Sequence, residues 1–220
     1  MLRNLLSTLA AAFSGGRDDA RSGGAADAST APAGAESVVR ETRFVRGFRV
    51  VVENGRPDIA TDAVLARLDE ALALVERYQP WRLRHLRRDL SEFWVVRFPC
   101  RGAYFPESRA CMTELTFLAR RDITAAPVAA SILHEGMHAR VDRMRLGGAP
   151  IDPATRDRAR EERICRHAEL DFGLALPPEL GAPVVDRALA TLSLDDAGVA
   201  PDVDWAEARR RQDAVDRMAT

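Results

Sequence analysis

The spacing of apolar residues changes near the middle of the chain, and this change limits the folds that the chain can adopt. Strand-like patterns occur only between residues 44 and 118, whereas every segment beyond residue 127 has apolar residues at helical spacing. Strands in the first half followed by helices in the second predict an α+β domain rather than alternating units with a parallel sheet. We therefore expect a small domain with a short antiparallel sheet, a pair of packed helices and further C-terminal helices.

Turn residues and helix caps divide this pattern into elements. Strands are predicted at residues 44–52, 93–98 and 111–118, and a loop carrying two aromatic side chains at residues 101–106. Proline, glycine and capping residues bound the expected helices, which cover residues 61–78, 81–90, 128–146, 154–172, 178–192 and 205–218.

The composition is that of an ordinary globular protein. Of the 220 residues, 46% are apolar and 30% are charged, and the formal net charge of −1 gives no reason to expect a nucleic acid as partner. The three cysteines lack CxxC spacing, which argues against a disulfide framework. Reduced thiols are typical of the cytoplasm, where we expect the protein to reside.

The first 37 residues differ from the rest of the chain. Residues 15–37 are mostly Gly, Ala, Ser, Asp and Arg, which cannot bury enough apolar surface to fold. We therefore expect a flexible segment at residues 1–37 and one folded domain at residues 38–220. The short apolar run from Leu5 to Phe13 leaves export or weak membrane association open, but no apolar run is long enough for a membrane-spanning helix.

The residues His134-Glu135-Gly136-Met137-His138 form an H-E-x-x-H motif on the expected helix at residues 128–146. Residues four apart lie one turn above each other on a helix, so that both imidazoles can reach one metal ion. Glu135 is adjacent to the first histidine and projects beside the ion, where it can act as general base. The motif predicts a bound Zn²⁺ and hydrolytic chemistry.

A catalytic zinc site has three protein ligands and one open position. No further histidine follows the motif before Gly147 and Gly148, so we expect the third ligand on the next helix. Glu162, 24 residues after His138, is the preferred candidate. The alternatives, in order, are Glu161, Glu169 and His167.

The motif, followed by a helix that carries glutamates, resembles the zincin metallopeptidases, and among them the branch with a glutamate as third ligand. Residues 93–174 also resemble a family of uncharacterised bacterial proteins with this motif. The resemblance implies a zincin-like domain in which His134, His138 and Glu162 bind zinc while Glu135 is the base for peptide-bond hydrolysis. The chain departs from the pattern at Arg166, where the branch commonly has an aspartate.

Other residues are candidates for supporting roles. Tyr104 or His85 could donate a hydrogen bond to the oxyanion of the tetrahedral intermediate. Asp142, one turn after His138, could orient that imidazole, although an ion pair with a neighbouring arginine such as Arg145 is the simpler interpretation. The strand at residues 111–118 is either an edge strand that pairs with substrate backbone or an ordinary core strand.

Cys165 lies on the same predicted helix face as Glu162. The simpler interpretation is a small buried hydrophobic side chain, and the alternative is a thiol that approaches the metal or Cys111. If Cys165, Cys100 or His167 fills the fourth position, the chain is a zinc-binding regulatory or adaptor protein without turnover. Otherwise we expect a peptidase acting on short peptides or flexible segments of proteins.

Overall fold

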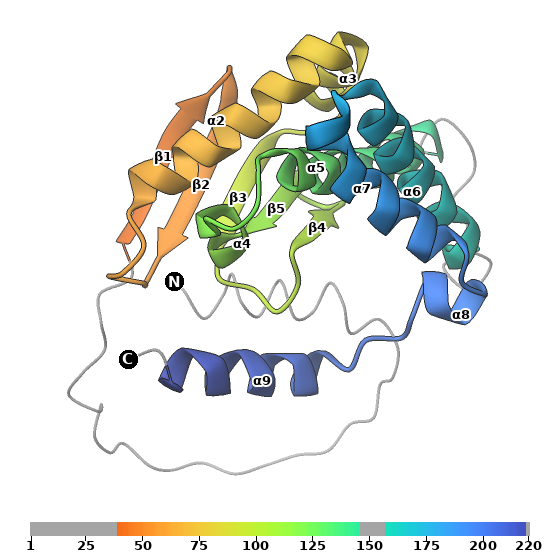
Figure 1. Ribbon diagram of the computed structural model, residues 1–220. Coiled ribbons are helices and arrows are strands. Elements are labelled where there is room, and N and C mark those ends of the chain that lie inside the picture. Colours follow the sequence, from red (N-terminus) through yellow and green to blue (C-terminus); the bar gives the residue numbers. More distant parts are fainter. Residues whose placement is uncertain (1–38, 146–156, 219–220) are drawn as a thin grey trace. The chain divides into compact units, whose positions relative to one another are not determined.

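The computed structural model describes residues 39–145 and 157–218, so the expectation of a flexible segment at residues 1–37 lies outside the described residues. By its internal contacts the chain divides into the units Met1–Ser37 and Val38–Thr220. The described residues of the second unit contain a sheet with the strand order β1-β2-β3-β5-β4 (Figure 1). The strands are β1 (Val39–Val45), β2 (Phe48–Asn54), β3 (Glu92–Val96), β4 (Gly102–Phe105) and β5 (Ala110–Glu114).

Helices follow and separate these strands. Between β2 and β3 lie α2 (Thr61–Tyr78) and α3 (Pro80–Asp89), and after β5 come α4 (Leu115–Ala119), α5 (Ala126–Arg145), α6 (Arg158–Ala175), α7 (Pro178–Leu192), α8 (Asp196–Val199) and α9 (Trp205–Met218). The expected α+β class is confirmed. The predicted helices are present, with ends shifted by a few residues. Of their expected residues, 146 and 154–156 lie outside the described part of the chain.

The sheet is mixed, so the expectation of an antiparallel sheet was wrong. Strands β2, β3 and β5 run parallel, while β1 and β4 are antiparallel to their neighbours. The reason is the connection through α2 and α3, a crossover that returns the chain to the same end of the sheet before β3 begins.

Three local predictions were also wrong. The expected single strand at residues 44–52 is a hairpin, in which Arg46 and Gly47 both adopt positive φ angles, of 47° and 81°, and so form the two-residue turn. The expected loop at residues 101–106 contains β4, which gains its strand conformation by pairing with β5. The expected strand at residues 111–118 ends at Glu114, whose side chain caps α4 by accepting a hydrogen bond from the backbone N–H of Phe117.

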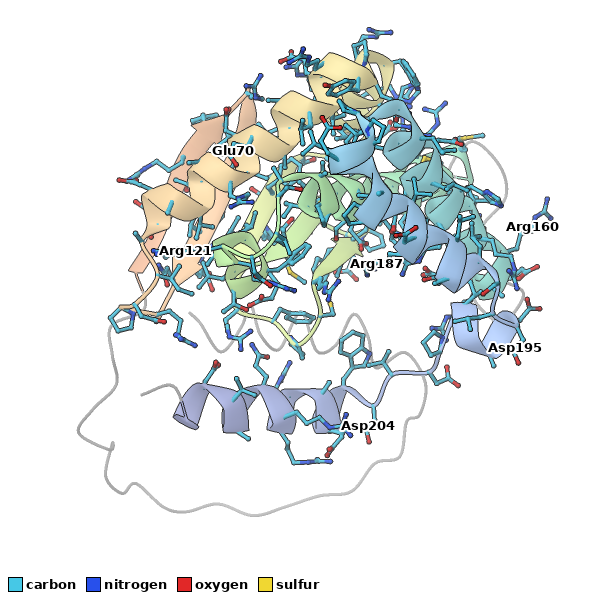
Figure 2. The ribbon with its side chains drawn as sticks, viewed as in Figure 1. Glu70, Arg121, Arg160, Arg187, Asp195 and Asp204 are labelled. Carbon is cyan, nitrogen blue, oxygen red and sulfur yellow. The ribbon has the colours of Figure 1, made fainter. Side chains whose placement is uncertain are left out.

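The core lies between one face of the sheet and the helices. Val64, Leu68 and Leu72, at helical spacing on α2, are completely buried with strand residues such as Val50 and Phe93. Many charged side chains lie on the outside, and Figure 2 shows Glu70 on α2 and Arg160 on α6 pointing away from the core. Among the described residues no helix is both long and apolar enough to cross a membrane.

Helices α5, α6 and α7 pack against one another (Figure 1). The contact between α6 and α7 depends on glycine, because a Cβ atom at Gly181 would lie 2.2 Å from the backbone oxygen of Gly173. This close approach holds α6 between α5 and α7, and it thereby fixes the helix that faces the H-E-x-x-H motif.

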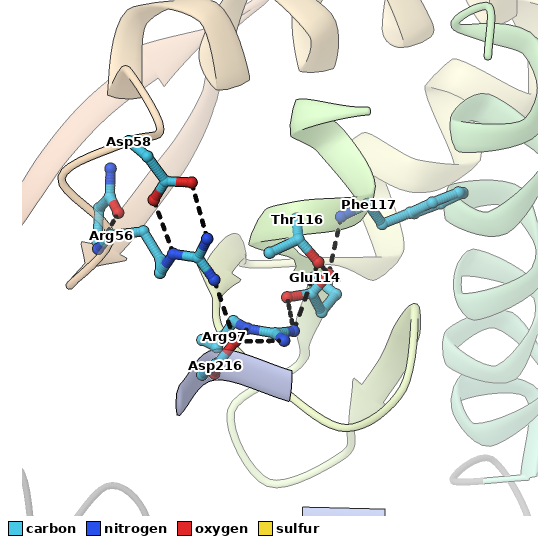
Figure 3. A network of polar contacts seen from close by, with 8 residues as sticks. Arg56, Asp58, Arg97, Glu114, Thr116, Phe117 and Asp216 are labelled. Carbon is cyan, nitrogen blue, oxygen red and sulfur yellow. Dashed lines mark hydrogen bonds and ion pairs between the residues drawn. The ribbon is translucent and has the colours of Figure 1, made fainter. Parts of the chain in front are cut away.

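The C-terminal helix α9 forms ion pairs with residues that follow strands β2 and β3 (Figure 3). Nη2 of Arg97 lies 2.9 Å and Nη1 of Arg56 3.1 Å from Oδ1 of Asp216, and Nη1 of Arg97 also lies 2.7 Å from Oε1 of Glu114. A cavity of about 410 Å³ remains between α9 and residues 97–101. The rings of Phe98 and Trp205, with centroids 5.9 Å apart, add an apolar contact, and Asp216 is the central charged attachment of the helix.

Replacing Asp216 with Asn should loosen α9 without unfolding the rest of the domain. Loss of partly exposed ion pairs costs about 1 kcal/mol, so amide hydrogen exchange in residues 205–218 should accelerate about five-fold. Hydrogen–deuterium exchange by mass spectrometry measures this rate. The matched control is Asp213→Asn, because Asp213 is exposed on the same helix. Equal exchange in the two variants would show that other contacts hold α9.

Candidate metal centre

Helix α5 carries both histidines of the motif on a rigid support. Ten of its residues are buried, including His134, and His138 is half-buried. A Cβ atom at Gly136 would lie 2.2 Å from Cδ2 of Leu86 on α3, so glycine at this position lets α3 pack directly against the motif helix. The space beside Gly136 is thus filled by a side chain of the core, and glycine here serves packing.

The ring nitrogens of the two histidines point toward one carboxylate on α6. The two Nε2 atoms are 3.2 Å apart. Oε2 of Glu162 lies 3.1 Å from Nε2 of His134, and Oε1 of Glu162 lies 3.3 Å from Nε2 of His138. Ligand atoms at the corners of a tetrahedron around zinc, each about 2.0–2.1 Å from the ion, are about 3.3–3.4 Å apart. The three side chains therefore have the mutual spacing of ligands around one ion.

The second nitrogen of each imidazole faces another glutamate of α6. Nδ1 of His138 lies 3.1 Å from Oε1 of Glu161. Nδ1 of His134 lies 2.7 Å from Oε1 of Glu169, although its ring N–H is not aligned with that oxygen. Carboxylates in these positions orient the rings so that each Nε2 lone pair is presented to a metal. Glu161 and Glu169 were weighed as alternative ligands, but their contacts are with the far side of each ring.

Each of these outer glutamates is itself held by an arginine. Nη1 of Arg145 lies 2.9 Å from Oε2 of Glu161, and Nη1 of Arg166 lies 2.7 Å from Oε1 of Glu169. Arg166, which replaces the aspartate of the resemblance, thus anchors the glutamate that faces His134. The sequence alone could not identify the two outer glutamates as partners of the imidazoles, or Arg145 as a partner of Glu161. Residue spacing does not determine which carboxylate oxygen lies near which ring nitrogen.

Glu162 differs from its two neighbours in its surroundings. In the described part of the chain its carboxylate contacts the two imidazoles and no arginine. Burial would raise the pKa of this carboxyl, but hydrogen bonds from His134 and His138 lower the pKa below its usual range. For His138, burial would lower the pKa, whereas hydrogen bonds to Cys165, Glu161 and Glu162 raise it well above the usual value. Glu162 and His138 thus stabilise each other's charged forms.

A third type of donor lies beside this group. The ligand atoms of His134, His138 and Cys165 lie within 4.8 Å of one another, and this buried group could hold a metal ion. The thiol of Cys165 is completely buried. The other cysteines stand apart from the group: Cys111 is buried in β5, and Sγ of Cys100 donates a hydrogen bond to the backbone oxygen of Gly102 at 3.0 Å.

The carboxylate of Glu135 lies beside Gly102 on the edge strand β4. Glu135 is 8% exposed, and among the described residues its carboxylate forms no hydrogen bond or ion pair. A Cβ atom at Gly102 would lie 3.1 Å from Oε1 of Glu135 and 2.9 Å from Oγ of Ser131. Gly102, which sequence reasoning missed, therefore gives this carboxylate its space. A carboxylate without a partner is available to accept a proton.

Replacing Gly102 with Ala tests this arrangement. The added methyl group should displace the Glu135 carboxylate by a few tenths of an ångström, because Ser131 closes the other side. If Glu135 is a general base, its displacement can cost about 100-fold in kcat. We expect a loss of about 10- to 100-fold in kcat with unchanged metal content. Ala103→Gly, at the next and buried position of β4, serves as the control for loss of strand stability, and a loss of activity in both variants would argue against the specific contact.

Tyr104 and Asp142, two further candidates for a role at the site, contact each other. The hydroxyl of Tyr104 lies 3.4 Å from Oδ2 of Asp142, and burial, reinforced by that carboxylate, raises the pKa of this phenol to about 12. Among the described residues Asp142 contacts Tyr104 rather than His138 or Arg145, so the expected contacts with these two residues are not formed. The place of Tyr104 in catalysis stays a prediction.

His85, His167 and the strand expected at residues 111–118 were also candidates for a role at the site. His85 lies on α3, where burial and the charges of Arg140 and Arg88 lower its pKa, and His167 is exposed on α6. Strand β5 is completely buried between β3 and β4, so that the core interpretation of residues 111–114 is correct and β4 is the edge strand instead.

No protein-family model, curated protein sequence or solved structure matches this chain. The site combines two imidazoles and a carboxylate that converge, a buried thiol beside them and a buried glutamate next to the first histidine.

Proposed function

We propose that this chain is a zinc-dependent hydrolase that cleaves amide bonds in peptides. The observation that carries the proposal is the convergence of two Nε2 atoms and one carboxylate at distances of 3.1 to 3.3 Å. All of these atoms are acceptors once the Nδ1 atoms carry the ring protons, so a cation between them removes their mutual repulsion. Nitrogen, oxygen and sulfur donors together favour zinc among the common divalent ions.

In this proposal His134, His138 and Glu162 hold the ion, and Glu161 and Glu169 keep the two rings in orientation. When bound, zinc would supply Lewis acidity that activates water and polarises the scissile carbonyl. Glu135 accepts the proton of the attacking water and later donates it to the leaving amine. Tyr104 remains a candidate for hydrogen bonding to the oxyanion, from the same edge strand.

The position of β4 supports a peptide as the substrate. It is the last strand of the sheet, with β5 on one side, and its Gly102 adjoins the Glu135 carboxylate. An extended peptide can add to a free strand edge through backbone hydrogen bonds, which places its amide groups along that edge. A short peptide or a flexible protein segment can adopt this extended form, whereas a folded domain cannot.

A zinc-binding regulatory or adaptor protein without turnover is the second candidate. The observation in its favour is Cys165, whose thiol lies with the two histidines and offers a fourth donor. Four protein ligands close a zinc site, whereas catalysis needs one open position. Hydrolysis by the loaded protein separates the two candidates.

Metal analysis of the purified protein is the first test. We expect about one zinc per chain by inductively coupled plasma mass spectrometry, and less than a tenth of this amount in His134→Ala. His167→Ala is the matched control, because His167 lies exposed on α6. A peptide library incubated with the loaded protein then reports cleavage. Wild-type protein that neither contains zinc nor can be loaded with it would refute the proposal.

A further inference from the structure

Cys165 lies three residues after Glu162 on α6, and residues at this spacing share one helix face. Helix α5 presents His134 and His138 from the opposite side, four residues apart. The two histidines of α5 thus contact Glu162 of α6, and they also form a ligand group with Cys165 of α6. The ligand atoms of Cys165 and the two histidines lie within 4.8 Å of one another. The side chain of Cys165 is completely buried.

We propose that Cys165 is the fourth ligand of the metal, so that the centre is closed when no substrate is present. This inference rests on the metal-binding part of the proposed function. Three ligand atoms with tetrahedral spacing leave one corner of the tetrahedron, and a thiolate is among the commonest zinc ligands. Cys165 is the cysteine found in the ligand group, whereas Cys100 and Cys111 lie outside it.

A fourth protein ligand would limit hydrolysis by the protein. Formation of the sulfur–metal bond releases the thiol proton, which water that enters the site with the metal carries to bulk solvent, and a proton returns to the sulfur by water when that bond breaks. A centre with four protein ligands is a structural one, so hydrolysis requires Cys165 to leave the metal. Cys165→Ser weakens this ligand with little change in side-chain volume, and the variant should hydrolyse peptides at least 10-fold faster than the wild type.

Cobalt substitution tests the ligand without reference to activity. Co²⁺ bound by a thiolate absorbs strongly in the near ultraviolet through sulfur-to-cobalt charge transfer. We expect this band in wild-type protein loaded with one Co²⁺ per chain, its loss in Cys165→Ser, and its retention in Cys100→Ser. The Cys100 variant is a matched control, because serine can keep the hydrogen bond to the Gly102 oxygen.

The outcomes separate this inference from the proposed function. Stoichiometric cobalt without the band, or a band that persists in Cys165→Ser, would overturn the role of Cys165 and leave the three-ligand hydrolase intact. Failure of the protein to bind cobalt or zinc at all would overturn both. Should Cys165→Ser not fold, X-ray absorption of zinc-loaded wild type decides: sulfur at about 2.3 Å supports the inference, and nitrogen and oxygen alone at about 2.0–2.1 Å refute it.

Discussion

Glu135→Gln is expected to lower kcat for the best-cleaved library peptide by about 100- to 10,000-fold, the usual contribution of a positioned general base. Glutamine has nearly the same shape as glutamate but cannot take up the proton of the attacking water. The carboxylate of Glu135 lies beside Gly102 and is not part of the ligand group of His134, His138 and Cys165, so the variant should keep its metal. Steady-state hydrolysis and zinc content, measured on one preparation, check both parts.

A charge-matched control accompanies this variant. Glu70→Gln removes one negative charge from α2, where the side chain is 62% exposed, and it should leave hydrolysis unchanged. If Glu135→Gln cleaves at the wild-type rate, another group is the base and our assignment is wrong. If it loses its zinc, Glu135 contributes to the ligand set, which the contacts of the carboxylate do not suggest.

Glu162→Gln is expected to weaken zinc binding far more than the same change at either outer glutamate. An amide oxygen is a poorer zinc ligand than a carboxylate, so the variant keeps only the histidines and Cys165 as strong donors. Glu161 and Glu169 orient the rings, and loss of such partners typically costs 10- to 100-fold in metal affinity. We expect a loss of roughly 1,000-fold or more for Glu162→Gln.

Competition against a chromophoric chelator measures the three affinities under identical conditions. The three variants also serve as controls for one another, because all three residues lie on α6 and each change removes one negative charge. The order of the losses is the decisive result. Should Glu169→Gln or Glu161→Gln weaken binding more than Glu162→Gln, the residue with the larger effect is the third ligand, and Glu162 has only an electrostatic role.

The helices could be predicted well, because their evidence is local. Pro80 begins α3, Pro178 lies at the start of α7, and apolar residues on α2 recur at helical spacing. The strands were predicted less well. A short strand such as β4 is stabilised by pairing with β5, a partner that no local pattern identifies, and the turn at Arg46 and Gly47 lacks the usual Asn-Gly signal.

The sequence alone determined that His134 and His138 lie one turn apart on one helix, with Glu135 beside them, because helical periodicity fixes the positions of neighbouring side chains. It also placed the acidic partners on the following helix. Only the tertiary structure decided which glutamate faces both Nε2 atoms and which ones face Nδ1. These contacts depend on the rotation and separation of α5 and α6. Packing of α5 against α3 at Gly136 and of α6 against α7 at Gly181 sets both quantities, and residue spacing alone does not predict them.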